Sequence, residues 1–326
     1  MADPQFYRSK SVLVTGAAGI VGSWLVGELI QSGAQVIGLI RDADPRSQLY
    51  RSGNADRIVQ VAGSLTEPGL IDRVLVKYEV DVVFHLGAQT QVRHAQRLPL
   101  ETLESNVRGT YLLLEAVRTL SRPVEALVVA SSDKAYGDSE LLPYVESHPL
   151  QGRNIYDASK SAADLLASAY AHSFGLPLAV ARCGNIYGGG DLNWDRLVPG
   201  TIRSLLLGDR PLMRSDGSPE RDYLFVDDAV SAYLTLASHV ANDGLVGDAF
   251  NFGAEEPVAV REVVAAIGTI MGREDLTPVV MADAPNEITA QWLDSRKARE
   301  RLGWNPAVPL HEGLARSVEW YREALA

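Results

Sequence analysis

Short apolar runs alternate with amphipathic stretches through the first 183 residues of the chain. The runs are mainly apolar and bounded by polar residues or glycine, as expected of buried strands, and they lie at 11–15, 36–40, 58–61, 80–86, 126–130 and 178–182. Stretches with helical periodicity lie between them, at 24–30, 67–78, 99–120 and 156–174. Strands that alternate with helices predict an α/β fold with a doubly wound parallel sheet.

The alternation stops after about residue 183, where Gly- and Asp-rich loops separate short helices. We therefore expect a dinucleotide-binding domain over 1–183 and a smaller C-terminal lobe, mainly for substrate, over 184–326. A return of the chain from one lobe to the other is compatible with the pattern, because no flexible linker separates them.

The composition of the chain excludes some classes of binding partner. The chain has 326 residues and a net charge of −11, which is unsuited to nucleic acid or an anionic membrane surface. The lone cysteine, Cys183, fits a reducing compartment. The N-terminal segment lacks the apolar core of a signal peptide and no run is long enough to span a membrane, so we expect a cytoplasmic protein. The histidines show no metal-ligand spacing, and we expect no metal.

The segment Thr15-Gly16-Ala17-Ala18-Gly19-Ile20-Val21-Gly22 carries the spacing TGxxGxxG. Such a turn lets the backbone approach a pyrophosphate and directs a helix N-terminus at its charge. A tight strand-to-helix turn without a ligand has the same glycines. The predicted strand before it and helix after it favour a Rossmann-type dinucleotide site.

Arg41 and Asp42 follow the second predicted strand, about 20 residues beyond the last glycine. An acidic residue there binds the ribose hydroxyls of NAD, whereas an arginine accommodates the 2′-phosphate of NADP. We predict NAD, with NADP as the alternative.

Tyr156 and Lys160 lie four residues apart at the start of a predicted helix and so share one face. A nearby lysine favours the phenolate and makes the tyrosine a usable base. Such a pair is also common on exposed helices. The nucleotide turn upstream and the hydroxyls after the strand at 126–130, in Ser131-Ser132-Asp133-Lys134, favour the catalytic interpretation.

Together with the late segment RDYLFVDD at 221–228, these motifs resemble the extended short-chain dehydrogenase/reductases of the nucleotide-sugar epimerase/dehydratase family. The resemblance spans nearly the whole chain. It is strongest to the CDP-glucose 4,6-dehydratase subgroup, in VTGAAGIVGSWL, SSDKAYG, RCGNIYGGGD and LDSRKARERLGWNP.

The resemblance implies roles for five catalytic residues. Tyr156 would take the proton of the sugar 4-hydroxyl, Ser132 would bind the same oxygen, and Lys160 would hold the nicotinamide ribose. Loss of water across C5 and C6 then needs an acid and a base. Asp133 fits the acid, and Lys134 stands where many sugar dehydratases have Glu.

The resemblance also implies ligand contacts and assembly. The cofactor would meet Gly16, Ala18, Gly19, Ile20, Val21, Arg41, Asp42, Ser64, Leu65, Leu86, Gly87, Ala88, Asn106, Ser131, Tyr156 and Lys160. A nucleotide-diphosphate sugar would meet Asn185, Arg196, Leu197, Arg221 and Asn251. A homodimer is expected through the helices at 99–120 and 156–174.

Two alternatives remain open. A nucleotide-sugar 4-epimerase would use the same Ser, Tyr and Lys but would not need Asp133 and Lys134. A catalytically silent, cofactor-binding scaffold on this fold would be expected to have lost catalytic residues, whereas Ser132, Tyr156 and Lys160 are all present.

Overall fold

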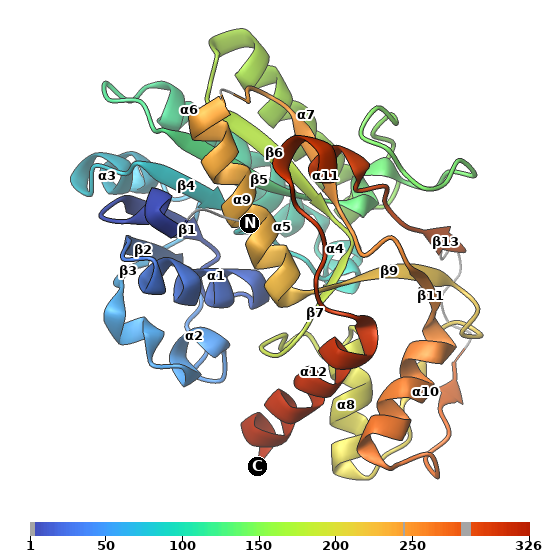
Figure 1. The fold of residues 1–326 in the computed structure, drawn as a ribbon. Helices are drawn as coiled ribbons and strands as arrows, with labels where there is room; N and C mark the ends of the chain where they lie inside the picture. The colour runs from blue at the N-terminus through green and yellow to red at the C-terminus, as the bar shows by residue number, and fades with distance from the viewer. Residues whose placement is uncertain (1–3, 244, 282–287) are drawn as a thin grey trace.

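The computed structural model describes residues 4–243, 245–281 and 288–326. Within them, a seven-stranded parallel sheet runs in the order β10-β6-β5-β4-β1-β2-β3 (Figure 1). Its strands are β1 (Ser11–Thr15), β2 (Gln35–Ile40), β3 (Val59–Ala62), β4 (Val82–His85), β5 (Ala126–Ser132), β6 (Leu178–Cys183) and β10 (Ala249–Phe252). The α/β class and the doubly wound sheet are confirmed. The predicted strand positions differ from the observed ones by one or two residues at their ends.

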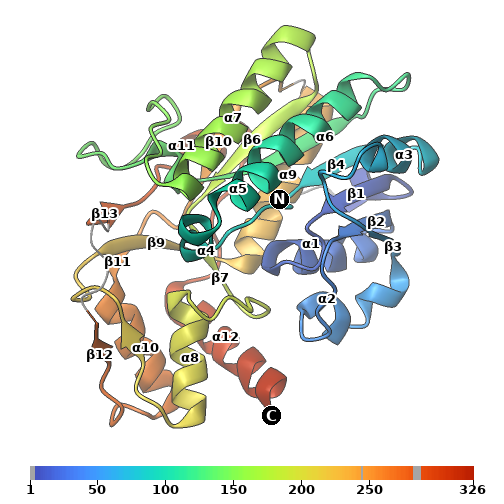
Figure 2. The same cartoon turned by 180° about the vertical axis from the view of Figure 1, so that it is seen from behind.

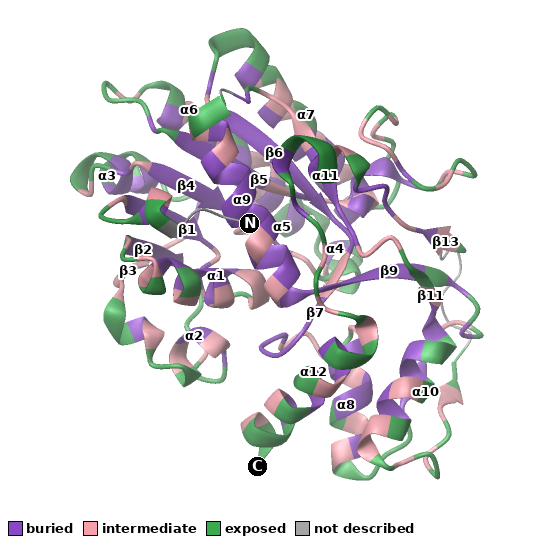
Figure 3. Cartoon of the chain, viewed as in Figure 1, coloured by how far each residue is buried: buried purple, intermediate pink, exposed green. Residues whose placement is uncertain are grey.

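Helices cover both faces of this sheet (Figures 1 and 2). One face carries α1 (Ile20–Gln31) and α9 (Val226–Asp243), and the other carries α3 (Leu70–Lys77), α6 (Gly109–Arg118) and α7 (Ile155–Phe174). Burial is concentrated in the strands and in the helix faces that meet them (Figure 3). Because helices cover both faces of the sheet, its strands are apolar on both sides, which explains their continuous apolar runs.

Two of the helical stretches predicted from the sequence differ from the helices in the structure. The stretch 99–120 is divided into α5 (Pro99–Leu103), a π-helical turn η3 (Glu104–Arg108) and α6. The stretch 67–78 begins helically only at Leu70, because Gly69 before it has a φ of +68°. Periodicity detects the buried face of a helix but not a local change in its hydrogen-bond pattern.

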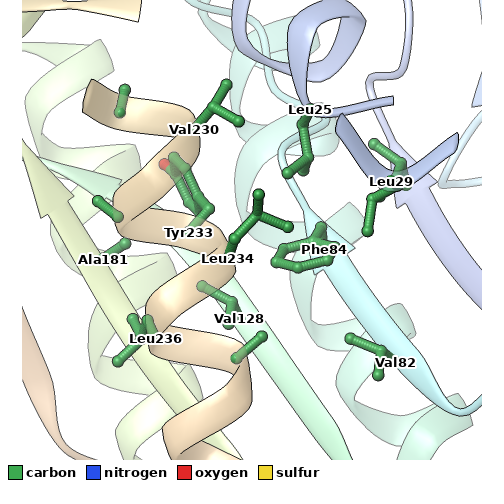
Figure 4. Packing of buried hydrophobic residues seen from close by; sticks show 14 of the residues in the cluster. Leu25, Leu29, Val82, Phe84, Val128, Ala181, Val230, Tyr233, Leu234 and Leu236 are labelled. Carbon is green, nitrogen blue, oxygen red and sulfur yellow. The ribbon is translucent and has the colours of Figure 1, made fainter. Parts of the chain in front are cut away.

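The chain returns to the large sheet after leaving it. Beyond residue 183 it enters the C-terminal lobe and then re-enters the sheet layers as α9 and β10, with β10 paired to β6. Figure 4 shows Val230 and Leu234 of α9 beside Leu25 of α1 and Phe84 of β4, and Tyr233 on the side of α9 near Ala181 of β6. The second half of the chain therefore completes the core of the first.

The C-terminal lobe is built on β9 (Glu220–Phe225), which pairs with β7 (Asn185–Tyr187), β11 (Pro257–Ala259) and β13 (Ala290–Gln291). Its helices α8 (Leu197–Leu207), α10 (Val260–Met271) and α12 (Leu310–Leu325) pack around a separate apolar cluster. The remaining elements are η1 (Pro4–Tyr7), α2 (Gln48–Arg51), η2 (Asn54–Arg57), α4 (Val92–Arg97), η4 (Asp133–Tyr136), β8 (Leu212–Met213), β12 (Val279–Val280) and α11 (Arg296–Leu302).

A buried histidine joins the carboxyl ends of β1 and β4. His85 Nδ1 lies 2.9 Å from Thr15 Oγ1, and its Nε2 lies 3.0 Å from Thr110 Oγ1. The Thr110 hydroxyl donates to the Asn106 carbonyl oxygen, so it accepts from Nε2–H, and Thr15 donates to Nδ1. This network accommodates the neutral ring.

We expect His85 to make the protein sensitive to acid. Burial, followed by the charge of Lys160, lowers the pKa of His85 from 6.5 to about 3. Between these two values the unfolded chain binds more protons, so stability falls as the pH drops from 6.5 to 3. In thermal melts, His85→Gln should lose less stability than the wild type over this window, although it is less stable at pH 7. If stability plotted against pH ran parallel for the two proteins, this prediction would be wrong.

Candidate active site

A cavity of about 1070 Å³ lies along the carboxyl ends of the parallel strands. Its wall includes the segments that follow β1, β2, β3, β4 and β5, and it continues into the C-terminal lobe at α8 and β9. This is the edge at which doubly wound sheets bind ligands. Its volume is slightly above the roughly 300–1,000 Å³ typical of small-molecule sites, so it is suited to large ligands.

The glycine-rich turn forms one end of the cavity. Gly16 has a φ of +70°, and a Cβ there would lie 2.9 Å from the Gly87 backbone. A Cβ on Gly22 would lie 2.2 Å from the Gly16 carbonyl oxygen. Gly19 is the N-cap of α1 and has no side chain over the helix end. The geometry thus presents the N-terminus of α1 to the cavity, as a pyrophosphate site requires.

Most of the residues expected at the cofactor line the same cavity. These are Gly16, Ala18, Gly19, Ile20, Val21, Arg41, Asp42, Ser64, Leu65, Leu86, Gly87, Ala88, Ser131, Tyr156 and Lys160. The hydroxyl of Ser131 is buried and has no hydrogen-bond partner among the described residues. A buried, unpaired donor in the wall suits a polar ligand.

Asn106 does not line the cavity. Its side-chain Oδ1 accepts from the Gln89 backbone N–H at 2.7 Å, and its Nδ2 donates to the Gln89 carbonyl and to Ser159 Oγ, each at 2.9 Å. We expected Asn106 to contact the cofactor, whereas its side chain is turned away from the cavity. It fixes the loop after β4 against α7 from behind the wall.

Arg41 and Asp42 form an ion pair at the edge of the cavity. Arg41 Nε lies 2.6 Å from Asp42 Oδ2, and both side chains are more than half exposed. Glu101 on α5 lies 4.0 Å from the same guanidinium. The arginine charge is thus partly compensated by two carboxylates, which disfavours a 2′-phosphate at this point.

Ser132, Tyr156 and Lys160 meet in the centre of the cavity wall. Ser132 ends β5, and the other two lie on the first turns of α7. The Tyr156 hydroxyl forms a hydrogen bond with the Ser132 side chain, and the Lys160 ammonium donates to the Ala130 carbonyl at 3.1 Å. The helical spacing and the strand end bring these residues together as the sequence predicted.

Burial dominates the ionisation of this group. It raises the pKa of Tyr156 to about 12, and Arg196 is the cation that lowers it most. Burial lowers the pKa of Lys160 to about 8. The sequence indicated Lys160 as the cation that activates Tyr156, whereas the tertiary structure supplies Arg196 from the other lobe.

Asp133 and Lys134 lie beside this group on η4. Asp133 is buried, and its Oδ1 accepts from the Ser132 hydroxyl at 2.9 Å. Its Oδ2 has no hydrogen-bond partner among the described residues and lies 3.8 Å from the Lys134 ammonium. Both residues line the cavity. The pair is therefore not an exposed surface ion pair.

The C-terminal lobe supplies cationic side chains and a side-chain amide to the end of the cavity away from the glycine-rich turn. Asn185, Arg196, Leu197 and Arg221 all line the cavity. Arg196 lies 3.0 Å from Asp191 Oδ2, and Asn185 Nδ2 donates to the Asp222 carbonyl at 3.4 Å. These groups are placed to meet an anionic ligand on a protein of net charge −11.

Asn251 lies away from this group. It is fully buried, and its Oδ1 accepts from the Tyr136 hydroxyl at 2.7 Å. Its Nδ2 donates to the Tyr144 carbonyl at 2.9 Å. Because these bonds occupy its side chain, the structure does not bring Asn251 to the cavity. The resemblance implied that Asn251 lies at the substrate, but the sequence could not show which way its side chain points.

Other polar residues of the cavity were not singled out from the sequence: Arg93, Asn154, Asp157, Asp191, Asp195, Arg214 and Tyr223. Asp157 is adjacent to Tyr156, and burial raises its pKa while Lys134 lowers it. Arg214 and Asp195 form an ion pair of 2.8 Å at the rim. The position of Asp157 next to Tyr156 was a usable signal. Arg214 lies in a loop whose fold the sequence does not indicate.

The described residues contain no cluster of three His, Cys, Asp or Glu side chains suited to a metal ion. No helix among 4–243, 245–281 and 288–326 is long and apolar enough to cross a membrane.

A pyrophosphate-type turn and a Ser/Tyr/Lys group in one cavity on a doubly wound sheet define an extended short-chain dehydrogenase/reductase.

Comparison with known proteins agrees with this class. Residues 13–317 match the family model described as GDP-mannose 4,6 dehydratase, and the chain belongs to this family. CDP-glucose 4,6-dehydratase of Salmonella typhimurium is 32% identical over 99% of this chain and 93% of the relative.

Two solved structures have the same fold. The dTDP-glucose 4,6-dehydratase DesIV of Streptomyces venezuelae, crystallised with NAD, has a TM-score of 0.88 and 30% identity, covering 96% of this chain and 97% of that one. UDP-glucose 4-epimerase of Thermotoga maritima, with UDP-glucose, has a TM-score of 0.88 and 28% identity, covering 97% and 100%. The fold thus accommodates both dehydratases and epimerases.

Proposed function

We propose that the protein is an NAD-dependent nucleotide-sugar 4,6-dehydratase similar to CDP-glucose 4,6-dehydratase. The observation that carries the proposal is the position of Asp133 and Lys134, which line the cavity directly beside Ser132 and Tyr156. A 4-epimerase returns the hydride to C4 and needs no such acid and base. The 32% identity to CDP-glucose 4,6-dehydratase supports the same assignment.

The proposed first step is oxidation of the sugar at C4. Tyr156 removes the proton of the 4-hydroxyl, and Ser132 donates a hydrogen bond to the same oxygen. Bound NAD would supply the hydride acceptor, taking hydride from C4 and later returning it to C6. Arg196 lowers the pKa of Tyr156 against the effect of burial, which favours the phenolate needed for proton removal.

The proposed second step is loss of water. The C4 ketone acidifies the proton on C5, which Lys134 removes, while Asp133 gives a proton to the departing C6 hydroxyl. The two groups lie 3.8 Å apart at the same wall, so one bound sugar can reach both. Return of hydride to C6 and of a proton to C5 gives the 4-keto-6-deoxy sugar.

NAD is the proposed cofactor, held by the turn at Gly16, Gly19 and Gly22, with Asp42 at its ribose. The NAD in the DesIV crystal structure supports this. We further propose that the substrate diphosphate lies between Asn185, Arg196 and Arg221. On this division, 1–183 with α9 and β10 forms the cofactor domain, and the rest of 184–326 forms the substrate lobe.

The test is the mass of the product. Purified protein is incubated with CDP-, UDP-, GDP- and dTDP-hexoses in the presence of NAD or NADP. A product lighter than its substrate by one water is expected with one of them and identifies the nucleotide. An isomer of unchanged mass would instead establish an epimerase and overturn the proposal.

We also propose a cytoplasmic homodimer. Its lone cysteine, Cys183, is buried and unpaired, as suits a reducing compartment. The outer faces of α5, α6 and α7 lie side by side (Figure 2) and expose Leu100, Leu103, Tyr111 and Leu165. Leu113 and Val117, by contrast, face the core. Contiguous exposed apolar residues mark an interaction surface.

Introducing charge on this surface should separate the dimer. Leu100 and Leu165 are 71% and 57% exposed, so Leu100→Arg with Leu165→Arg disturbs little within one chain. Sedimentation should give twice the chain mass for the wild type and one chain mass for the double variant. Leu207→Arg, at an exposed residue of α8, is the control and should stay dimeric. A wild type sedimenting as one chain would contradict the proposed dimer.

A further inference from the structure

A fully buried glutamine of the C-terminal lobe contacts both proposed dehydration residues. Gln291 lies on β13, 157 residues from Lys134 along the chain. Its Oε1 accepts a hydrogen bond from the Lys134 ammonium, and its Nε2 donates to the Asp133 carbonyl at 3.0 Å. We propose that Gln291 is a positioning residue that holds Lys134 in place to remove the C5 proton. The inference rests on the proposed dehydratase function.

The backbone around Gln291 is fixed on two sides. β13 pairs with β9, with Gln291 opposite Arg221. On its other side, the Tyr144 N–H donates to the Trp292 carbonyl, and the Asp294 N–H donates to the Tyr144 carbonyl, each at 2.9 Å. A side chain on a rigid, buried strand can set the position of a flexible lysine.

The amide suits a lysine that must release and regain a proton. Lys134 faces two carboxylates, Asp133 on η4 at 3.8 Å and Asp157 on α7, whose charges attract its ammonium. An amide oxygen can accept a hydrogen bond from both the ammonium and the neutral amine, because both carry N–H donors, and being uncharged it favours the ammonium less than a carboxylate does. Gln291 therefore orients Lys134 without committing it to the charged form, as a carboxylate at this point would.

The same strand pair connects Lys134 to the substrate end. Arg221, proposed at the diphosphate, lies opposite Gln291 in the β9–β13 ladder. A substrate held by Arg221 is thus in register with the residue that fixes Lys134. This arrangement places binding and elimination on one rigid element, which keeps C5 within reach of the base.

Gln291→Met tests the positioning role, because methionine has a similar length but neither accepts nor donates in this way. We expect the dehydration rate to fall about 100-fold, as for misplacement of a catalytic group by about 1 Å. KM and the rate of C4 oxidation, followed by reduction of bound NAD, should stay unchanged. Gln60→Met is the control: Gln60 also donates to a backbone carbonyl, that of Ala55, and accepts from Tyr50, but lies outside the cavity.

A double-substitution cycle separates positioning from a general structural effect. If Gln291 acts through Lys134, Gln291→Met adds no further loss to Lys134→Met. Additive losses, or a parallel fall in C4 oxidation, would show a structural role and overturn the inference. A wild-type rate of dehydration in Gln291→Met would also overturn it while leaving the proposed function intact. A wild type that forms no dehydrated product would remove the proposed function itself.

Gln291→Glu provides an independent readout if the methionine variant folds poorly. The new carboxylate keeps an oxygen near Lys134 and favours its charged form, while Asp133, Asp157 and Tyr144, which forms a hydrogen bond with Gln291, are present in both proteins. The rising limb of the pH profile for dehydration should therefore move to higher pH, with folding checked by thermal melts. An unchanged pH profile would overturn the inference.

Discussion

Tyr156→Phe is expected to reduce C4 oxidation by about 100- to 10,000-fold, the usual contribution of a general base. The substitution removes only the phenol oxygen, which forms a hydrogen bond with Ser132 in the cavity wall. The ring, 8% exposed, keeps its packing, so stability should change little. Substrate should still bind, because Asn185, Arg196 and Arg221 are unaltered.

The measurement is reduction of bound NAD in a single turnover, together with product formation over many turnovers. Tyr170→Phe is a matched control, since Tyr170 lies on the same helix but its hydroxyl contacts Glu115 outside the cavity. Turnover of Tyr156→Phe at the wild-type rate would refute the proposed mechanism at its first step.

The pH dependence of oxidation follows from the same residue. Burial raises the pKa of Tyr156 to about 12, so only a small fraction is ionised near neutral pH. The ionised fraction increases with pH below that value, and the oxidation rate of the wild type should rise accordingly. In Tyr156→Phe the residual rate should lose this dependence.

Asp133→Asn should stop loss of water while sparing C4 oxidation. The amide keeps the shape of the carboxyl group, so an oxygen can still accept from the Ser132 hydroxyl, now 2.9 Å away. It has no proton to give to the departing hydroxyl, and a loss of about 100-fold or more is expected in dehydration. The reduced cofactor and 4-keto sugar should accumulate on the protein.

Product mass and NAD reduction, followed in the same reaction, separate the two steps. Asp138→Asn is the control, since Asp138 is an exposed carboxylate five positions later and outside the cavity. Dehydration by Asp133→Asn at the wild-type rate would show that another group supplies the proton. Asp157, which directly follows Tyr156 in the sequence and lines the same cavity, would then be the next residue to replace.

Local sequence predicted much of the cofactor half of the site. Gly16 and Gly22 are required by backbone geometry within one turn, and Tyr156 and Lys160 share a face of one helix. Ser132 ends a strand whose apolar run is evident in the sequence. Each of these depends on residues only a few positions apart, so spacing alone predicts their relative positions.

The contributions of the second half of the chain could not be predicted in this way. Asn251, and in the first half Asn106, were expected at ligands by resemblance, yet their side chains are turned to Tyr136 and to Gln89 rather than to the cavity. Arg196 acts on Tyr156 from 40 positions away, and its role follows from where α8 begins rather than from any local pattern.

The sequence by itself determined the doubly wound sheet, the glycine turn and the Ser132, Tyr156 and Lys160 group, because periodicity and short spacings act within single elements. Only the tertiary structure decided that α9 and β10 complete the first domain, that Arg196 rather than Lys160 lowers the pKa of Tyr156 most, and that Gln291 meets Lys134. Each of these relations joins residues that are far apart in the chain, and such long-range packing leaves no periodic trace in the sequence.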